Sequence, residues 1–283
     1  MRTIPRPGTT PSFQATGGET GNRDRRGEIT WRYPRPTRDG RVLPNGNVLL
    51  TLSRSQDDPG GGVVEVARSG KILFECQGTQ SEVNTAQRFD TGTTPVSEVG
   101  DKPRQLEADR QGRVVVEVPL KAQIKDHHLQ TRMARRLASG NDLVSRLLDK
   151  VVREYNSAGE VVCEVPTPDM PFTAIRLLGG NTLIGCTRGN LAIEVDPTGD
   201  TVWRLTNDDL PTRPINDACG VQRLPNGNTV VTSHRARGEE VKLLEVTPGQ
   251  QVDRAYRNGG VPGIHHFPIL DTDGKAIEGV PLR

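Results

Sequence analysis

Cysteine, aromatic residues and long apolar runs are all scarce in this chain of 283 residues. The four cysteines have no C-x-x-C spacing of the metal-binding type and are too few for a disulfide scaffold of this size. No apolar run approaches the length of a membrane-spanning helix, so the sequence predicts no membrane span. A net charge of only +2 gives no global field that would favour nucleic acid or an acidic membrane surface.

The first residues of the chain are rich in proline, threonine and glycine and have no apolar core of the signal-peptide kind. We expect residues 1–26 to form a flexible lead-in and residues 27–283 to form a single domain. The sequence therefore predicts a soluble chain but does not indicate its cellular compartment. We expect the protein to be a monomer. Arginines are frequent in residues 23–41, but few aromatic residues lie between them, which favours a solvated basic edge over nucleic-acid binding.

Glycine and proline are abundant, with 31 and 21 residues, and this favours many turns and short strands over long helices. A hairpin turn recurs about every 45 residues along the chain. Asn-Gly between apolar runs is a strong hairpin signal because both residues tolerate a positive φ. The copies are Leu43–Asn47, Phe89–Thr93, Leu137–Asn141, Leu177–Asn181 and Leu224–Asn228, with a degenerate sixth copy at Leu270–Gly274.

A second marker has the same period. It is a turn glycine followed by a short strand and preceded, in most copies, by a strand that carries a glutamate. The glutamates, which we interpret as architectural, are Glu65, Glu107, Glu154, Glu194 and Glu245. Each unit then contains four short strands, which is the pattern of one β-propeller blade. The sequence predicts an all-β fold, a six-bladed β-propeller of four-stranded antiparallel blades.

The ends of the chain are expected to complete the last blade. The strand after Gly27 would join it and remove an exposed sheet edge, so that the N-terminal strand closes the ring. Its neighbour, the third strand of that blade, would come from residues 12–16. Residues 133–150 also have the pattern of an amphipathic helix, but Gly140 lies where the repeat places a turn, and a glycine there disfavours a helix.

With the units aligned, the pattern LPNGN, followed by a strand ending in Glu-Val, a turn glycine and a tryptophan, resembles the quinoprotein-type repeats of β-propellers. Trp31 and Trp203 occupy the position of the docking tryptophan in such repeats. Over residues 27–283 the chain resembles bacterial PQQ-like and arylsulfotransferase-like propeller proteins. Other residues replace the tryptophan in the remaining blades, which argues against a genuine pyrroloquinoline quinone cofactor. The sulfotransferase resemblance implies a histidine supported by an arginine, and no unique position matches that pair.

Residues that break the repeat near the mouth of the central channel are the best candidates for function, because ligands usually gather there. Four of the five histidines form two His-His pairs, at 127–128 ahead of blade three and at 265–266 ahead of blade six. The fifth histidine follows the second strand of blade five, on the same face. We expect a catalytic or binding site formed by His128, His266, His234, Asp217 and Arg188.

Three interpretations of this cluster remain open. Adjacent residues on a strand face opposite ways, so either His128 and His266 or the other member of each pair faces the channel. Together with Asp217, the facing pair could bind a divalent metal such as Mn, Fe or Zn. Alternatively, the histidines act without a metal as acid, base or nucleophile, and an arginine such as Arg188 clamps an anionic substrate. In the third interpretation they only hold loops in place through backbone carbonyls.

The leading functional hypothesis is a protein that binds or transforms a small anionic or carbohydrate-type ligand, as a lyase, hydrolase or transferase. The alternative is a non-catalytic propeller that serves as a protein-interaction scaffold. A funnel lined with histidine, aspartate and arginine favours the first, whereas a flat apolar patch favours the second.

Overall fold

Short β-strands make up nearly all of the regular structure in a computed structural model of the chain, which describes residues 12–16, 19–23, 29–121, 124–260 and 263–266. The described residues contain no helix beyond two 3-10 turns, η1 (His127–Leu129) and η2 (Asn207–Asp209), and neither is long enough to cross a membrane. The strands are β1 (Ser12–Thr16), β2 (Glu19–Arg23), β3 (Ile29–Tyr33), β4 (Thr37–Val42), β5 (Val48–Leu52), β6 (Gly62–Val66), β7 (Ile72–Gln77), β8 (Glu82–Ala86), β9 (Thr94–Val99), β10 (Arg104–Ala108), β11 (Val114–Pro119), β12 (Ala134–Arg136), β13 (Asp142–Arg146), β14 (Val151–Tyr155), β15 (Val161–Pro166), β16 (Pro171–Arg176), β17 (Thr182–Cys186), β18 (Leu191–Val195), β19 (Thr201–Leu205), β20 (Val221–Arg223), β21 (Thr229–Thr232), β22 (Val241–Val246) and β23 (Val252–Arg257).

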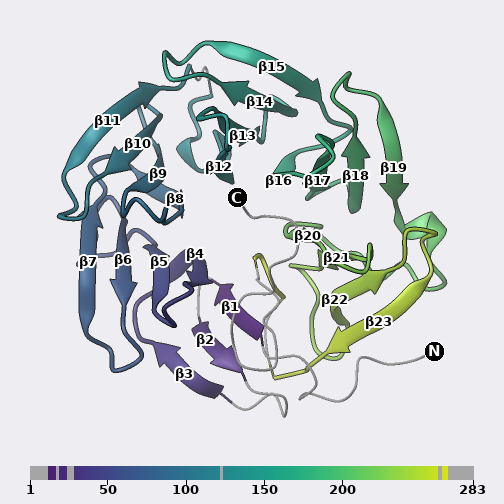
Figure 1. Cartoon of the computed structure of the whole chain (residues 1–283). Helices are drawn as coiled ribbons and strands as arrows, with labels where there is room; N and C mark the ends of the chain where they lie inside the picture. Colours follow the sequence, from purple (N-terminus) through teal and green to yellow (C-terminus); the bar gives the residue numbers. More distant parts are fainter. Residues whose placement is uncertain (1–11, 17–18, 24–28, 122–123, 261–262, 267–283) are drawn as a thin grey trace.

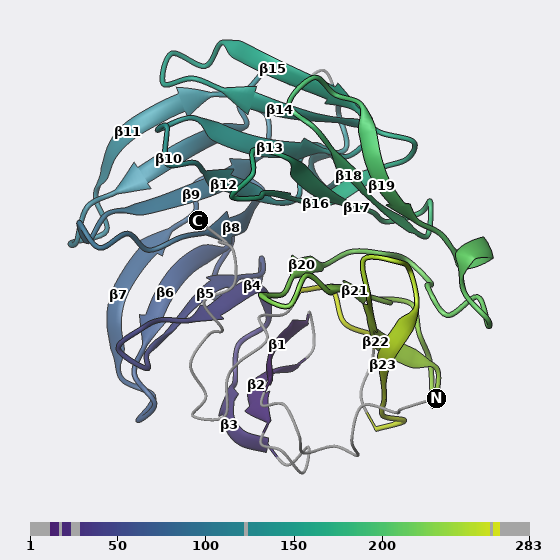
Figure 2. The same cartoon turned by 45° about the vertical axis from the view of Figure 1, so that its right-hand side comes forward.

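These strands form six sheets arranged around a common centre (Figure 1). Five sheets are antiparallel meanders of four consecutive strands, β4–β7, β8–β11, β12–β15, β16–β19 and β20–β23, which we number as blades one to five. The first strand of each blade lies nearest the centre and the fourth lies at the rim (Figure 1, Figure 2). The prediction of an all-β propeller is therefore confirmed.

The prediction of six four-stranded blades is wrong, because the described residues form five. The remaining sheet has three strands in the order β1, β2, β3 and lies between blades five and one (Figure 1). β3 pairs with β2, not with residues 12–16, which form β1 on the other side of β2. The segment Glu19–Arg23 was missed because it has no alternation of apolar residues. Strands β1 and β2 thus lie within residues 1–26, and the expected sixth turn at Leu270–Gly274 lies outside the described residues.

The repeated hairpin turn has the geometry that its sequence predicts. In blade five, Gly227 adopts a φ of +85°, which an L side chain rarely adopts. The Leu224 N–H donates to the Asn228 carbonyl at 2.8 Å, and the Asn228 N–H donates to Asn226 Oδ1 at 3.0 Å. The same backbone hydrogen bond closes the first hairpin in each of the four remaining blades. Residues 133–150 follow this pattern as two strands rather than as a helix.

Apolar side chains are buried mainly between neighbouring blades. One cluster joins Leu49 and Phe74 of blade one to Val96 and Leu106 of blade two. The second strands of all five blades are buried along their whole length, because a neighbouring sheet packs against each of their faces. The core is therefore a series of interfaces arranged around the ring.

A recurrent polar contact also joins each blade to the next. Glu154 of β14 accepts hydrogen bonds from Asn141 Nδ2 of its own turn at 2.7 Å and from Arg176 Nη2 of blade four at 2.8 Å. Charge-assisted bonds of this kind are stronger than neutral ones. The equivalent ion pairs are Glu65–Arg88, Glu107–Arg136 and Glu194–Arg223. These pairs support the architectural interpretation of the repeated glutamate.

Trp203 occupies the docking position that the repeat assigned to it. Its indole Nε1 donates to the Pro248 carbonyl of blade five at 3.0 Å, and Arg223 of blade five lies over its ring at 5.7 Å from the centroid. The side chain therefore fastens the rim of blade four to the next blade.

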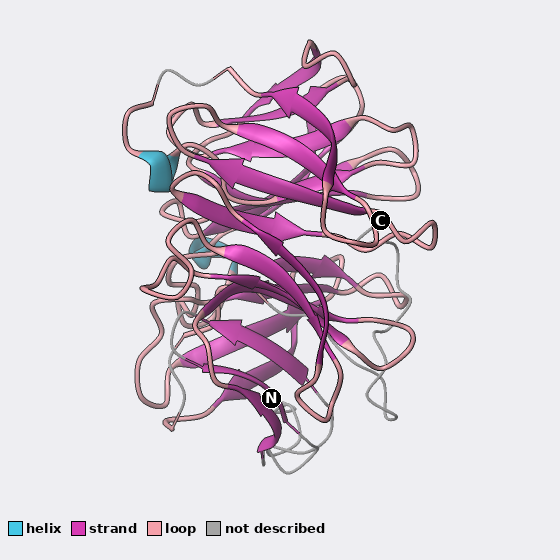
Figure 3. Cartoon of the chain, turned by 90° about the vertical axis from the view of Figure 1, so that its left-hand side faces the viewer, coloured by secondary structure: helices cyan, strands magenta, loops and turns pink. Residues whose placement is uncertain are grey.

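Each first strand begins, and each second strand ends, on one face of the disc. Both 3-10 turns lie on a single side of the molecule in Figure 3, and η1 leads into the first strand of blade three. We call the segments that precede β4, β8, β12, β16 and β20, and those that follow β5, β9, β13, β17 and β21, the mouth loops. The repeated hairpin turns and their glutamate contacts lie at the other end of these strands.

We predict that Glu154→Ala lowers the free energy of unfolding by about 1–3 kcal/mol, because it leaves Asn141 and Arg176 without their shared acceptor. Urea denaturation measures the change. Glu164→Ala is the matched control, since this rim glutamate is 44% exposed and pairs with Arg153. It is expected to change the free energy by less than about 0.5 kcal/mol. Equal effects of the two substitutions would contradict a special role for the inter-blade contact.

Candidate functional site

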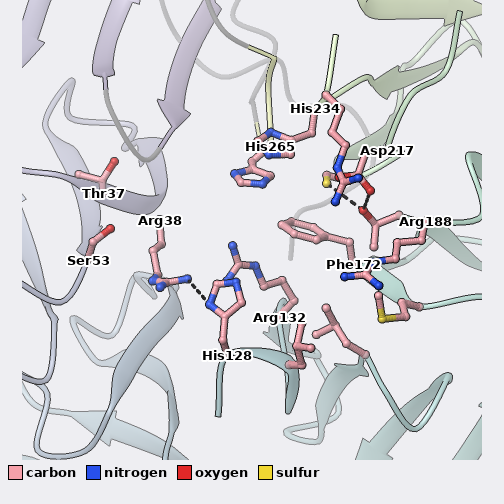
Figure 4. A pocket seen from close by; sticks show the side chains of 16 residues that line it. Thr37, Arg38, Ser53, His128, Arg132, Phe172, Arg188, Asp217, His234 and His265 are labelled. Atoms are coloured by element: carbon pink, nitrogen blue, oxygen red, sulfur yellow. Dashed lines mark hydrogen bonds and ion pairs between the residues drawn. The ribbon is translucent and has the colours of Figure 1, made fainter. Parts of the chain in front are cut away.

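The mouth loops enclose a cavity of about 380 Å³ (Figure 4). Among the described residues its lining carries four arginines and three histidines but a single carboxylate. The expected site residues His128, His234, Asp217 and Arg188 all line it, whereas His266 does not. The ionisable and aromatic lining residues are Arg38, Arg132, Arg188, Arg235, His128, His234, His265, Asp217 and Phe172.

The two histidine pairs present different members to the cavity. His128 lines it, whereas His127 bonds to Ser81 Oγ at 2.6 Å and faces Asp101. Strand alternation does not apply here, because these residues form the 3-10 turn η1. In the second pair His265 lines the cavity and His266 is buried away from it. The structure thus brings His128 and His265 to the cavity, one member from each of the two alternatives.

His266 belongs to a buried polar cluster in the channel. Its Nε2 lies 3.3 Å from Asp39 Oδ1, and Asp39 Oδ2 lies 3.3 Å from Arg135 Nη2. Burial lowers the pKa of His266 to about 4, although the Asp39 carboxylate opposes that shift. The imidazole is therefore neutral at neutral pH, and it acts here as a partner of Asp39.

Arg132 is the buried cation of the lining, with only 8% of its surface exposed. Within the described part of the chain its Nη1 has no hydrogen-bond partner, and no carboxylate forms an ion pair with it. Its guanidinium lies 5.0 Å from the ring centroid of Phe172. Burial, and then the charge of Arg38, lower the pKa of Arg132 to about 10, so it stays protonated at neutral pH. A buried unpaired charge is costly, and a bound anion would offset that cost.

A stack of planar groups continues from Arg132 across the cavity wall. The ring centroids of Phe172 and His265 are 5.4 Å apart, and those of His265 and His234 are 3.2 Å apart. The rings are nearly parallel in both pairs. Burial lowers the pKa of both imidazoles, and that of His265 falls well below its usual range. His234 Nδ1 is buried and has no hydrogen-bond partner among the described residues. These two histidines therefore add polar atoms to the wall without adding charge.

Of the histidines that line the cavity, His128 is the one that pairs with a carboxylate among the described residues. Its Nδ1 lies 3.2 Å from Glu82 Oε2, and Arg38 lies 2.7 Å from the other oxygen of that carboxylate. Burial alone would raise the pKa of Glu82, but the His128 hydrogen bond and the charge of Arg38 hold it below its usual range. Arg38 Nη1 also lies 3.4 Å from this Nδ1, slightly farther than the Glu82 oxygen (Figure 4). When Nδ1 donates to Glu82, the neutral ring keeps an acceptor lone pair on Nε2, which makes no hydrogen bond to any described residue. The pair thus has the arrangement of an oriented general base.

Asp217 is fixed by several partners in a backbone conformation that is rare for a residue with a side chain. Its φ is +71°. The Thr187 hydroxyl donates to Oδ1, Arg235 Nε lies 3.1 Å from Oδ2, and the backbone N–H donates to Asn190 Oδ1 at 2.6 Å. Its carboxylate therefore positions Arg235 at the cavity. The adjacent Cys219 is buried, and burial raises the pKa of its thiol, which disfavours the reactive thiolate.

The described residues contain no group of three or more His, Cys, Asp or Glu side chains that could hold a metal ion. The three residues expected as metal ligands do not converge. His128 bonds to Glu82, His266 to Asp39, and Asp217 to Thr187 and Arg235. These three residues are therefore not placed around one shared position.

Comparison with solved structures shows the same fold. A protein of unknown function from Bacteroides caccae is similar with a TM-score of 0.80 and 20% identity, over 92% of this chain and 98% of that one. A catalytically inactive virginiamycin B lyase from Staphylococcus aureus with quinupristin gives 0.61 and 12%, over 95% and 94%. The WD40 propeller domain of Doa1 gives 0.58 and 12%, over 78% and 70%. At such identities the likeness shows the fold alone.

No family model and no curated protein matches the sequence. The resemblance to PQQ-like and arylsulfotransferase-like proteins is therefore not confirmed. Function has to be inferred from the cavity itself.

Several residues in or beside the lining were not among the expected site residues. Arg38 and Glu82 lie at the beginning of strands β4 and β8, where no histidine marks the loop. Phe172 lies in β16, a first strand that fits the repeat pattern, so nothing in the sequence indicated that it lines the cavity. Its stacking against His265 and Arg132 is seen only in the structure. A comparison of the same strand position in every blade would have found Arg38, because Arg38, Arg132 and Phe172 each lie five residues before the first leucine of the hairpin turn.

We predict that the free energy of unfolding falls as the pH is lowered from 6.5 to about 4, the ordinary and folded pKa values of His266. In that window the unfolded chain binds a proton at this residue and the folded chain does not, so each such histidine contributes a slope of up to about 1.4 kcal/mol per pH unit. Urea unfolding at several pH values measures it. His266→Gln is expected to make the decline shallower, and an unchanged slope would contradict the assignment.

Proposed function

We propose that the cavity at the channel mouth binds a small anionic ligand. The observation that carries this proposal is Arg132, a buried guanidinium on the cavity wall with no carboxylate partner among the described residues. Three further arginines surround the same space, and its volume of about 380 Å³ suits a small molecule. A bound carboxylate, sulfate or phosphate would supply the missing counter-charge.

We further propose that His128 exchanges a proton with the bound ligand. The Glu82 carboxylate fixes Nδ1 and stabilises the imidazolium that forms when Nε2 takes a proton. The cluster thus supplies a base beside an anion-binding arginine, which suits lyase, hydrolase or transferase chemistry. The similar fold of virginiamycin B lyase is compatible with such chemistry, but the proposal rests on these residues.

A cavity lined with arginine, histidine and aspartate favours ligand binding, whereas a protein-interaction scaffold would present a flat apolar patch. Within the described residues, the large exposed apolar side chains lie mostly on the fourth strands at the rim, away from the mouth loops. They include Ile72, Leu73, Val114, Val115, Val161 and Val202. The cavity is therefore the better supported functional surface.

Arg132→Gln is expected to weaken the binding of sulfate, phosphate or hexanoate by about tenfold to a hundredfold, the effect of losing a charged hydrogen bond. Isothermal titration calorimetry measures the affinities at fixed ionic strength. Arg237→Gln is the matched control, because this exposed arginine lies in the mouth loop after β21 but does not line the cavity. Equal losses in both variants would indicate general electrostatic attraction and would contradict the proposal.

Anion binding at neutral pH is expected to be accompanied by proton uptake, because a negative charge beside His128 favours its imidazolium form. Calorimetry in buffers of different ionisation enthalpy gives the number of protons. His128→Gln is expected to abolish most of the uptake while anions still bind, whereas His127→Gln retains it. Undiminished uptake in the His128 variant would rule out this histidine as the proton acceptor.

A further inference from the structure

The charged groups around the cavity fall into two clusters on different parts of the ring. The first cluster comes from blades one, two and three and consists of Arg38, Glu82, His128 and Arg132. The second comes from blades four and five and consists of Arg188, Asp217 and Arg235. In the view of Figure 4, Arg38 and His128 lie to one side of Phe172, and Arg188 and Asp217 lie to the other.

Each cluster has two guanidiniums and one carboxylate. Glu82 pairs with Arg38 in the first cluster, at 2.7 Å, and Asp217 pairs with Arg235 in the second, at 3.1 Å. Among the described residues, no carboxylate forms an ion pair with Arg132 or with Arg188. Both of these side chains line the cavity. Arg132 is buried whereas Arg188 is exposed, and each cluster therefore presents one guanidinium that pairs with no carboxylate of the described residues.

The cavity wall also contains apolar side chains that could contact the uncharged part of a ligand. Leu129, Leu147, Met170 and Phe172 all line the cavity. The stacked histidines add no charge, because burial keeps both of them neutral. Apolar walls with a few charged groups at defined points are the usual means by which a pocket fixes a ligand's orientation.

Resting on the proposed function, we infer that the ligand is a small dianion with two carboxylate-type groups joined by a short apolar segment. One group binds Arg132 in the first cluster, and the other binds Arg188 in the second. A phosphate or sulfate carries its charge on one centre, so it would balance one cluster and leave the other unmatched. The structure thus favours two separated charges over one concentrated charge.

Calorimetric titration tests this with succinate, adipate and suberate against butyrate, hexanoate and octanoate, at fixed ionic strength. The best diacid is expected to bind at least about tenfold more tightly than the monoacid of equal length, the minimum for one further charged contact. Arg132→Gln and Arg188→Gln are each expected to reduce the diacid to the affinity of the monoacid. Arg237→Gln is expected to keep the full preference.

The possible outcomes separate this inference from the proposed function. If monoacids, sulfate or phosphate bind as tightly as the best diacid, the dianion inference is overturned and the anion-binding proposal stands. If none of these anions binds, both are overturned. Circular dichroism and urea unfolding show whether a variant is folded. Arg132→Lys serves as a second variant that keeps the charge, and it is expected to keep a preference for the diacid.

Discussion

A glutamate shared between two blades is the contact on which the ring depends. It accepts from the hairpin turn of its own blade and from an arginine at the end of the next blade's first strand, as Glu154 does with Asn141 and Arg176. The link therefore fixes the turn, the register of the hairpin and the neighbouring blade together. It lies at the end of the strands opposite the mouth loops. The ring can thus be held at one end of its strands while the other end carries the cavity.

Local chemistry explains why much of this fold is predictable from the sequence. The turns need a positive φ at a fixed position, and glycine marks that position in every blade, as Gly227 does. The blade count failed where the local signal was absent. Strand β2 is polar, and the sixth turn was inferred from a degenerate copy of the motif.

The site was harder to predict, because the role of an arginine depends on its partners in space. Arg132, Arg135 and Arg136 lie within five residues of one another in the sequence. Arg136 pairs with Glu107 of blade two, and Arg135 pairs with the channel carboxylate Asp39. Only Arg132 of these three is left without a carboxylate in the described structure and lines the cavity. The facing of each histidine pair was ambiguous for a similar reason, since a 3-10 turn replaces the expected strand at His127–Leu129.

The stack of Arg132, Phe172, His265 and His234 joins blade three, blade four, the segment after β23 and blade five through ring contacts. Each member packs against the next, so no one of these segments can change its planar residue without leaving a void beside its neighbour. The glutamate–arginine contacts between blades lie away from the mouth loops and leave their sequences free to vary. The stack, in contrast, makes these four segments vary together. Divergence of the pocket in related chains would then proceed by concerted replacement of the stack rather than one loop at a time.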